Sequence, residues 1–478
     1  MLLDIGSTYT KVTVVDVQAN RVVGRSAAPS TVGHGVQHGI LEALGKLSGS
    51  PVDSLDEGFA PFKHRFACSS AAGGLRMVVI GLVDSLTVEA GRRTAFGAGA
   101  KVIKAFADHL GPGEVLQIEE ISPDIILLTG GTDGGDRETI LHNAGALAES
   151  RISCPVIVAG NRECSQEVSS LLRKGRKEAR TAENVMPDLG KLNPASAGKE
   201  IRDVFFERIT EAKGLEIVKR WIGNIIPTPM AVLQGAVLLN EGTDGTPGMG
   251  ELIVLDVGGA TTDVHSIARG KSNNPGTTVY QGLEEPFAKR TVEGDLGIRY
   301  NAGTILNQIG VGVVQEELSH FACGPDPVLD EELFRYAEFL SKRCDHLSSS
   351  PWQKQVEFAF ASICLRTAFH RHAGRVIAEL SPLMEVKSFT VVRGKDLRDV
   401  PHVIGTGGIF AYQQEEGAHL LRRCLERLDP AVLLPLNPAL YIDSEYLLYG
   451  AGLLCEKFPE AAFAIAKNSL QRVGPDVM

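Results

Sequence analysis

Two stretches of this chain join a carboxylate to small residues of the kind that bind phosphate. They are residues 4–11 (DIGSTYTK) and residues 256–263 (DVGGATTD), each placed after an apolar run. Gly, Ser and Thr offer backbone N–H groups and hydroxyls with little side-chain bulk, so phosphate oxygens can approach closely. A carboxylate beside them can hold a divalent cation, usually through water. The two stretches together predict a nucleotide held between two related parts of the chain.

Strand-like runs flank each stretch, so we expect two β-hairpins. Residues 1–3 (MLL) and 252–255 (LIVL) lead into the turns, and β-branched runs follow at 12–15 and 264–267. Two such runs joined by a turn of small residues are typical of a hairpin. The pattern therefore places Asp4 and Asp256 at equivalent strand ends.

A third glycine-rich turn lies at residues 403–408 (VIGTGG). Here a buried strand breaks into glycines and a helix begins, so a flat ring or a phosphate can rest on bare backbone. Such a turn occurs in many α/β proteins when it stands alone. Its position after two phosphate-type hairpins favours a role in holding the nucleotide.

Composition narrows the class of protein. The 478 residues suggest two or three domains, and 44% hydrophobic with 22% charged residues is typical of a globular protein. The net charge of −10 argues against a nucleic-acid partner. The start of the chain lacks a basic leader and no apolar run is long enough to span a bilayer, so we expect a cytoplasmic protein without a membrane partner. The eight cysteines are scattered, which argues against an iron–sulfur cluster or a structural zinc site.

The order of strand-like and helix-like segments predicts the domains. Alternation of the two kinds of segment up to residue 165 indicates a first α/β domain with parallel strands. Residues 166–248 are expected to be a mainly helical connecting segment. A second α/β domain is expected over residues 249–478, with a long helical block at about 353–380.

The ordered triple of turns resembles the actin/hexokinase/heat-shock ATPase superfamily. The resemblance implies an α/β fold with two actin-like ATPase (ribonuclease H-like) domains flanking a nucleotide cleft. Carried over by motif, Asp4 and Asp256 are catalytic carboxylates that hold Mg²⁺ through water while the γ-phosphate of ATP leaves. The residues that would bind ATP are Gly6, Ser7, Thr8 and Lys11 in the first loop, Gly258, Gly259, Thr261, Thr262 and Asp263 in the second, and Gly405, Thr406, Gly407 and Gly408 in the adenosine turn.

Asp133 is a further candidate catalytic residue. It follows a strand-like run within residues 128–135 (LTGGTDGG). Relatives in the superfamily often place a carboxylate or amide there to position the attacking water or hydroxyl. A turn aspartate that tolerates an unusual backbone conformation between glycines explains the pattern equally well.

Four blocks make the resemblance more specific: residues 69–77 (SSAAGGLRM), 128–135, 291–297 (TVEGDLG) and 403–408. Together they are similar to the GlmL/MutL family, accessory proteins of glutamate (methylaspartate) mutase that are unrelated to the mismatch-repair protein called MutL. The likeness runs from residue 1 to about 460. It implies a slow ATPase that reactivates or protects an adenosylcobalamin-dependent mutase as a chaperone, with the mutase subunits as partners. A homodimer is compatible with the sequence.

The cobalamin itself is expected in the partner. The nearest match to the Asp-x-His-x-x-Gly motif of lower-ligand histidines is residues 263–268 (DVHSIA), which lacks the final glycine, so His265 is interpreted as a strand residue.

Three other functions remain open. A small-molecule kinase of the same superfamily would need a substrate pocket, and a nucleotide-dependent scaffold of cytoskeletal type would need filament contacts or a membrane-binding tail. The activator of 2-hydroxyacyl-CoA dehydratases has the same fold, but the scattered cysteines argue against its iron–sulfur cluster.

Overall fold

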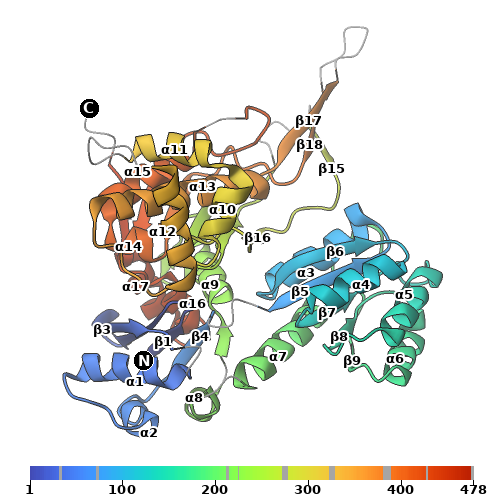
Figure 1. The fold of residues 1–478 in the computed structure, drawn as a ribbon, viewed down its shortest axis with the longest axis horizontal. Helices are drawn as coiled ribbons and strands as arrows, with labels where there is room; N and C mark the ends of the chain where they lie inside the picture. The colour runs from blue at the N-terminus through green and yellow to red at the C-terminus, as the bar shows by residue number, and fades with distance from the viewer. Residues whose placement is uncertain are drawn as a thin grey trace. The chain divides into compact units, whose positions relative to one another are not determined.

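The computed structural model describes residues 1–31, 35–70, 75–211, 215–223, 225–271, 278–321, 329–380, 389–426 and 429–474. The chain forms two compact units, drawn in Figure 1. Unit 1 consists of Met1–Gly73, Ala212–Gln281 and Glu285–Met478, and unit 2 consists of Gly74–Glu211 with Gly282–Glu284. Residues 71–74 of the first family-like block lie outside the described residues.

The first sheet of unit 1 begins with the predicted hairpin. Its strands are β1 (Leu2–Ile5), β2 (Tyr9–Asp16), β3 (Arg21–Pro29), β4 (Phe66–Ser69) and β10 (Ile225–Pro227). Their order is β3-β2-β1-β4-β10, in which β1, β2 and β3 pair antiparallel while β4 and β10 continue in parallel. The helices α1 (Val36–Ser48) and α2 (Leu55–Phe59) join β3 to β4, and α8 (Leu215–Ile222) leads into β10.

The second sheet of unit 1 repeats this topology. It contains β13 (Leu252–Val257), β14 (Thr262–Ile267), β16 (Ala288–Glu293), β19 (His402–Thr406) and β20 (Ala439–Asp443), with β21 (Leu470–Arg472) added at the edge. The order β16-β14-β13-β19-β20 again has three antiparallel strands followed by two parallel ones. The repeat confirms the predicted α/β fold of two related domains.

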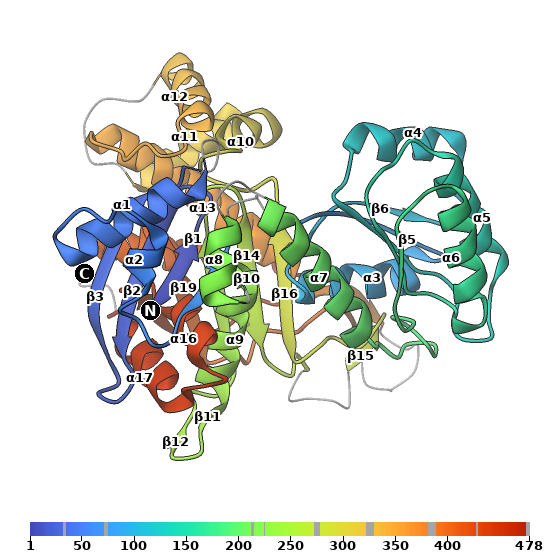
Figure 2. The ribbon, with the colours of Figure 1, turned by 90° about the horizontal axis from the view of Figure 1, so that it is seen from below.

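The helices that follow the fifth strand of each sheet pack against each other. They are α9 (Thr228–Glu241) and α16 (Leu448–Leu454), seen side by side in Figure 2. A Cβ atom at Gly235 would overlap the carbonyl oxygen of Leu448, and one at Gly452 would overlap that of Ala231. Glycine at these two positions therefore lets the helix backbones touch. The helix α17 (Pro459–Ser469) packs beside this pair.

Further helices of unit 1 pack around the second sheet. They are α10 (Ala302–Ile309), α11 (Val311–His320), α12 (Asp330–Lys342), α13 (Pro351–His372), α14 (Gly408–Tyr412) and α15 (Gln414–Cys424). The buried side chains of α13, such as Phe360 and Phe369, join those of β13 and β14 in one apolar core.

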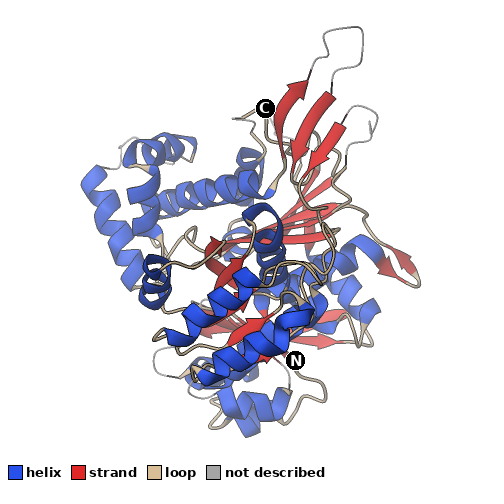
Figure 3. Ribbon diagram, turned by 90° about the vertical axis from the view of Figure 1, so that its right-hand side faces the viewer, coloured by secondary structure: helices blue, strands red, loops and turns tan. Residues whose placement is uncertain are grey.

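The predicted helical block at 353–380 is correct only as far as His372. The chain then continues as β17 (Arg375–Leu380), which pairs with β18 (Phe389–Arg393), and β18 pairs with β15 (Thr278–Gln281), in a separate three-stranded sheet (Figure 1 and Figure 3). A Cβ atom at Gly374 would lie 2.7 Å from the carbonyl carbon of Gly394. This close approach of two backbones directs the chain away from a helix and into the sheet. The junction at 240–250 contains two short strands, β11 (Gly242–Thr243) and β12 (Thr246–Pro247).

Unit 2 is a parallel sheet with helices. Its strands are β5 (Arg76–Gly81), β6 (Lys101–Ala107), β7 (Ile125–Leu128), β8 (Val156–Val158) and β9 (Ala179–Thr181), in the order β6-β5-β7-β8-β9. Its longer helices are α3 (Glu89–Gly97), α4 (Pro112–Ile121), α5 (Glu138–Glu149), α6 (Ser165–Lys174) and α7 (Ala195–Glu211). Here α3 packs with α7, while α5 packs with α4 and α6. This is the doubly wound arrangement, which explains the strand–helix alternation in the sequence.

The predicted boundaries at residues 165 and 248 do not coincide with those of the compact units. The main segment of unit 2, Gly74–Glu211, is inserted between β4 and β10, which are hydrogen-bonded neighbours in one sheet of unit 1. The mainly helical segment 166–248 is divided, with α6 and α7 in unit 2 and α8 and α9 in unit 1. Alternation of strands and helices does not reveal which strands share a sheet, so the insertion is not visible in the pattern.

Candidate functional site

The first hairpin loop, residues 4–11, has a backbone that requires glycine. The N–H of Gly6 donates to the carbonyl of Tyr9 at 3.1 Å, and a Cβ atom on Gly6 would collide with that same carbonyl oxygen. The turn stays tight for this reason, and it directs Asp4 into the interior, where only 1% of the residue is exposed. The loop therefore combines open backbone with one buried carboxylate.

Three groups satisfy the Asp4 carboxylate. Lys11 Nζ donates to Oδ2 at 3.0 Å, and Thr228 Oγ1 donates to Oδ1 at 2.9 Å. Cys68 Sγ lies 3.5 Å from Oδ1, and burial together with the nearby Asp4 charge raises the pKa of this thiol well above its ordinary value, so it stays a donor. The Lys11 ammonium also lies 4.2 Å from the centre of the Tyr446 ring. Asp4 is thus charge-balanced and fixed in place.

The second hairpin loop, residues 256–263, has a similar backbone but a different charge pattern. Its turn closes with Gly258 N–H donating to the Thr261 carbonyl at 2.9 Å. Asp256 lies opposite Asp263 in the strand register. Burial, and next the Asp263 carboxylate, raise the pKa of Asp256 to about 7, while Lys11 acts in the opposite direction.

Arg290 on β16 compensates the charge of Asp263. Its Nε donates to Asp263 Oδ1 at 2.9 Å, and both side chains are buried. Thr261 Oγ1 donates to the other oxygen, Oδ2, at 3.1 Å. The second loop therefore holds one compensated carboxylate, Asp263, beside one that is near its titration point, Asp256.

The end of the family-like block 291–297 and the residues directly after it support the second loop. Thr262 Oγ1 donates to the Leu296 carbonyl at 2.6 Å. The backbone N–H groups of Arg299 and Tyr300 both donate to the carbonyl of Gly259 at 2.9 Å. These bonds fix the peptide planes of the loop, which must be rigid if its N–H groups are to point at a ligand.

The glycine turn, residues 405–408, lies directly against Asp256. Gly407 has φ of +109°, a conformation that suits glycine, and a Cβ atom there would lie 3.1 Å from Asp256 Oδ1. A Cβ atom at Gly405 would meet the Phe410 ring at 2.7 Å, while Gly408 opens α14. The structure therefore brings the third motif into contact with the second.

The Thr406 hydroxyl is engaged within the protein. Its Oγ1 donates to Asp443 Oδ2 at 2.8 Å. Asp443 also accepts from the backbone N–H groups of Leu447 and Leu448 at the start of α16. This carboxylate ties the glycine turn to the helix that packs on α9.

The two hairpin loops also touch each other. A Cβ atom at Gly259 would lie 3.0 Å from the methyl carbon of Thr8, and the Tyr300 hydroxyl donates to the Ser7 carbonyl at 3.3 Å. The structure therefore assembles the predicted loops from both sheets of unit 1. The exception among the predicted site residues is Asp133, which belongs to unit 2.

Comparison with known proteins identifies the family. The family model described as MutL protein matches residues 1–470. Protein MutL of Clostridium tetanomorphum is 42% identical over 478 residues, which cover 99% of each chain. The chain belongs to the MutL family. The predicted resemblance to GlmL/MutL proteins is confirmed.

Solved structures are much more distant from this MutL-family chain. Xylulose kinase of Bifidobacterium adolescentis is 11% identical, with 99% of this chain and 93% of that one covered and a TM-score of 0.28. A carbohydrate kinase of Novosphingobium aromaticivorans is 12% identical, with the same coverage and a TM-score of 0.26. The Ppx/GppA phosphatase of Aquifex aeolicus is 11% identical, with coverage of 90% and 72% and a TM-score of 0.21. At such scores these likenesses carry no argument about function.

Asp133 organises loops within unit 2. Its Oδ1 accepts from the backbone N–H of Arg162 at 2.9 Å and from Asn184 Nδ2 at 3.0 Å. Its own N–H donates to the Pro187 carbonyl at 2.9 Å. These contacts join the loops that follow β7, β8 and β9, and the catalytic role of Asp133 stays a prediction.

Magnesium is the metal that the donor set of this MutL-family site would suit. Mg²⁺ in phosphate sites is held by one or two carboxylates, with waters and phosphate oxygens filling the other positions. Asp4 and Asp256 supply two carboxylates from adjoining loops, and the Asp4 charge is among the causes that raise the pKa of Asp256. Within the described part of the chain, no group of three or more His, Cys, Asp and Glu side chains could hold a metal ion. The two carboxylates fit a cation whose remaining ligands are waters and phosphate oxygens.

Sequence motifs missed three residues that complete the site. Thr228 binds Asp4, Arg290 binds Asp263, and Asp443 binds Thr406. Each lies in a strand or directly at the end of one. Only the sheet topology places that strand next to the partner residue. The register of β14 with β16 is the signal that would have found Arg290.

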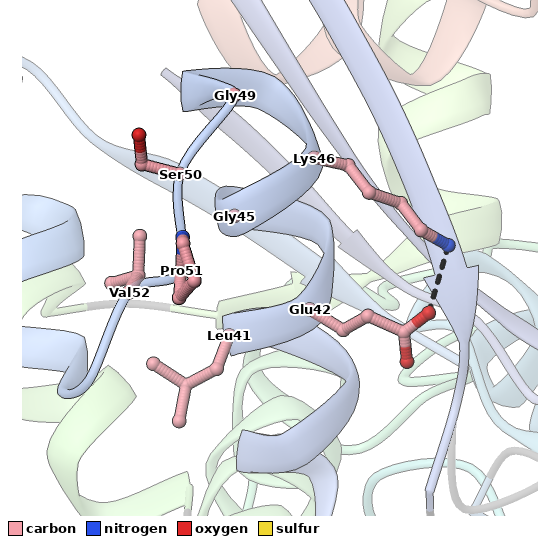
Figure 4. Close-up of a pocket in the computed structure, with 8 residues that line it drawn as sticks. All are labelled: Leu41, Glu42, Gly45, Lys46, Gly49, Ser50, Pro51 and Val52. Carbon is pink, nitrogen blue, oxygen red and sulfur yellow. Dashed lines mark ion pairs between the residues drawn. The ribbon is translucent and has the colours of Figure 1, made fainter.

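A hollow beside α1 is a weaker candidate, drawn in Figure 4. It measures about 530 Å³ and is lined by Leu41, Pro51 and Val52 with several small residues. Its two charged side chains, Glu42 and Lys46, pair with each other at 2.8 Å. None of the predicted site residues lines it.

The structure also bears on the interpretation of His265 as a strand residue and on the expected lack of a membrane-spanning helix. His265 lies in β14 with its residue fully buried and with no hydrogen-bond partner for either ring nitrogen among the described residues. Burial lowers its pKa well below the ordinary value, so the ring is neutral. Among the residues that the structure describes, no helix has the length and apolar character needed to cross a membrane.

Proposed function

We propose that this protein binds ATP with Mg²⁺, hydrolyses it slowly, and uses it to reactivate an adenosylcobalamin-dependent mutase. The proposal that the protein binds ATP rests on three motifs of unit 1 that lie close together. They are the two hairpin loops and the glycine turn, which meet around Asp4 and Asp256. The mutase part rests on membership of the MutL family. A cytoplasmic location and a homodimer stay predictions.

The chain's own residues would divide the work. Backbone N–H groups of the two loops bind phosphate oxygens, and Lys11 turns from Asp4 toward them to offset their charge. Asp4 and Asp256 hold the cation through water, and Mg²⁺ when bound neutralises charge that develops on the phosphates. The bare backbone at Gly407 leaves space for the nucleoside. Water would attack the γ-phosphorus as the bond to the bridging oxygen breaks.

We also propose Asp133 as the residue that positions this water. The substitution Asp133→Ala should lower ATP turnover sharply while leaving nucleotide affinity unchanged, measured by steady-state hydrolysis and by calorimetry. Asp188→Ala removes an exposed carboxylate from the same unit and serves as the control. If hydrolysis by Asp133→Ala equals that of the control, Asp133 has no part in the reaction and its role is the loop contact described above.

The mutase experiment separates the proposed function from its main rival. ATP hydrolysis is measured alone, with active purified mutase, with mutase inactivated by turnover, and with candidate small metabolites. We expect inactivated mutase to stimulate hydrolysis and to regain activity. Transfer of the γ-phosphate to a metabolite would instead identify a small-molecule kinase and overturn the proposal.

A further inference from the structure

A buried carboxylate on α13 connects the two hairpin loops to an aromatic cluster. Glu357 is 4% exposed, and it accepts hydrogen bonds from Arg299 at 2.9 Å, Tyr336 at 2.8 Å and Ser348 at 3.1 Å. A second Arg299 nitrogen lies 2.5 Å from its other oxygen. A buried charge is tolerated only when it is paired in this way, so Arg299 and Glu357 act as one unit.

Arg299 connects this unit to the second hairpin loop. Its backbone N–H donates to the Gly259 carbonyl at 2.9 Å. A Cβ atom on Gly259 would lie 3.3 Å from Arg299 Cγ and 3.0 Å from the Thr8 methyl. Because both groups pack against the same side of Gly259, a shift of the loop toward them must move the Arg299 side chain or the first hairpin.

Residues near Ser348 connect the same carboxylate to the first hairpin loop. The Tyr9 hydroxyl donates to the carbonyl of Asp345 at 2.9 Å. Asp345 lies in the short segment between α12 and α13 that also carries Ser348. The second hairpin loop therefore contacts Arg299, which is bonded to Glu357. The first hairpin loop contacts Asp345, which lies within a few positions of Ser348, another partner of Glu357.

Tyr336 continues the connection to the surface. Its ring meets Trp352 edge to face at 4.9 Å and stacks with Phe339 at 6.2 Å between ring centres. Trp352 is 37% exposed and Phe339 is 40% exposed. We call Tyr336, Phe339 and Trp352 the aromatic cluster. The Tyr336 hydroxyl is bonded to Glu357, so a displacement of the carboxylate reaches the rings directly.

We propose that Glu357 is a positioning residue that couples the second hairpin loop to the aromatic cluster. The inference rests on the proposed function, because it names how that nucleotide site is regulated. Binding of ATP moves Arg299 and Glu357 and alters the surroundings of Trp352. Coupling between two sites is reciprocal, so a molecule that presses on the aromatic cluster changes ATP affinity by the same factor.

The two tryptophans make the test direct. Trp221 and Trp352 are the two in the sequence, so Trp221→Phe leaves Trp352 as the single fluorescent indole. In this background the protein is titrated with Mg·ATP while fluorescence is followed, and binding is measured separately by calorimetry. We expect a fluorescence change that saturates at the ATP concentration where the heat of binding saturates.

Two variants in the Trp221→Phe background test the coupling residues. Glu357→Gln should raise KM for ATP about tenfold and leave kcat within about threefold, because loop geometry and not the reacting group is changed. Tyr336→Phe keeps the ring but removes its bond to Glu357, so it should reduce the Trp352 response by roughly half or more while KM stays the same. It also remains informative if Glu357→Gln does not fold.

Glu338→Gln is the matched control. It removes the same charge from exposed Glu338 on α12, which pairs with Lys342. The inference is overturned if both variants match this control in their Trp352 response and in their KM. It is also overturned if calorimetry shows ATP binding while the Trp352 fluorescence does not change. An absence of binding heat would overturn the proposed function as well, so the two failures are distinguishable.

Discussion

The two hairpin loops share a backbone and differ in charge at the same position. In each, the carboxylate residue lies opposite a charged residue in the strand register: Asp4 opposite Lys11, and Asp256 opposite Asp263. Opposite charges across a strand pair stabilise it, whereas like charges destabilise it. The first loop is charge-balanced by its own residues, while the second depends on Arg290 from β16.

The difference shows that the order of residues within such a loop determines its backbone geometry. The charged residues next to its carboxylate determine the electrostatics of the loop. Asp256 has its pKa raised to about 7 by burial and by Asp263, which places it at its titration point near neutral pH. Under the proposed function, a cation at Asp256 would compete with a proton. The affinity of the second loop for Mg²⁺ should then change with pH.

The largest expected effect comes from removing either carboxylate. At pH 8, Asp4→Asn and Asp256→Asn should each lower ATP hydrolysis by about 100-fold, because the cation loses a charged partner. At pH 6 the wild-type Asp256 is mostly protonated and resembles the amide. Because pH 6 is one unit below the pKa, the ratio of wild-type to Asp256→Asn hydrolysis should be about tenfold smaller there than at pH 8. The corresponding ratio for Asp4→Asn should persist. Steady-state hydrolysis at both pH values is the measurement, and equal pH profiles for the two variants would contradict the comparison.

A smaller effect is expected from the hydroxyl partners of the two loops. Thr228→Val removes a buried donor from the Asp4 carboxylate. A hydrogen bond to a charged group contributes about 1.5–3 kcal/mol, so its loss should raise KM for Mg·ATP roughly tenfold or more. Thr261→Val removes a donor from Asp263, which keeps its bond to Arg290, so KM should rise only about twofold. Kinetics of the two isosteric variants test this, and a larger effect of Thr261→Val would reverse the comparison.

The raised pKa of Asp256 also predicts how stability depends on pH. The folded protein holds a proton on Asp256 that the unfolded chain releases near pH 4, so this contribution to stability is complete below pH 4. It is lost as the pH rises through about 7 and is absent above that. Asp256→Asn should therefore be more stable than wild type at pH 8, by about 1–2 kcal/mol after allowance for solvent screening. Urea unfolding at pH 5 and pH 8 measures it, and an unchanged difference between the two proteins would contradict the assignment.

The smallest effect concerns the aromatic neighbour of Lys11. Tyr446→Leu removes the ring that faces the ammonium, and about 0.5–1 kcal/mol of stability should be lost. Tyr446→Phe keeps the ring and should behave as wild type. Thermal unfolding of the two variants gives the answer, and an equal loss in both would assign the effect to the hydroxyl instead of the ring.

Sequence reasoning succeeded where the signal is local. Asp4 and Gly6 lie within one turn, and so do Asp256 and Gly258, so residue order alone predicted both loops. It failed where the partner comes from a distant element, as for Thr228 at the start of α9 and Arg290 on β16, because register and topology decide those contacts. The β17 strand was predicted as helix for the same reason: its conformation depends on pairing with β18.

The insertion of unit 2 between β4 and β10 also determines the order in which the protein can fold during synthesis. Ser69 and Pro227 are paired in one sheet, yet the segment Gly74–Glu211 of unit 2 leaves the ribosome between them, at about 5–20 residues per second. Contacts between residues so far apart in the chain form late. A nascent chain that ends at Glu211 contains every strand of the parallel sheet of unit 2, while its Asp4 carboxylate still lacks Thr228.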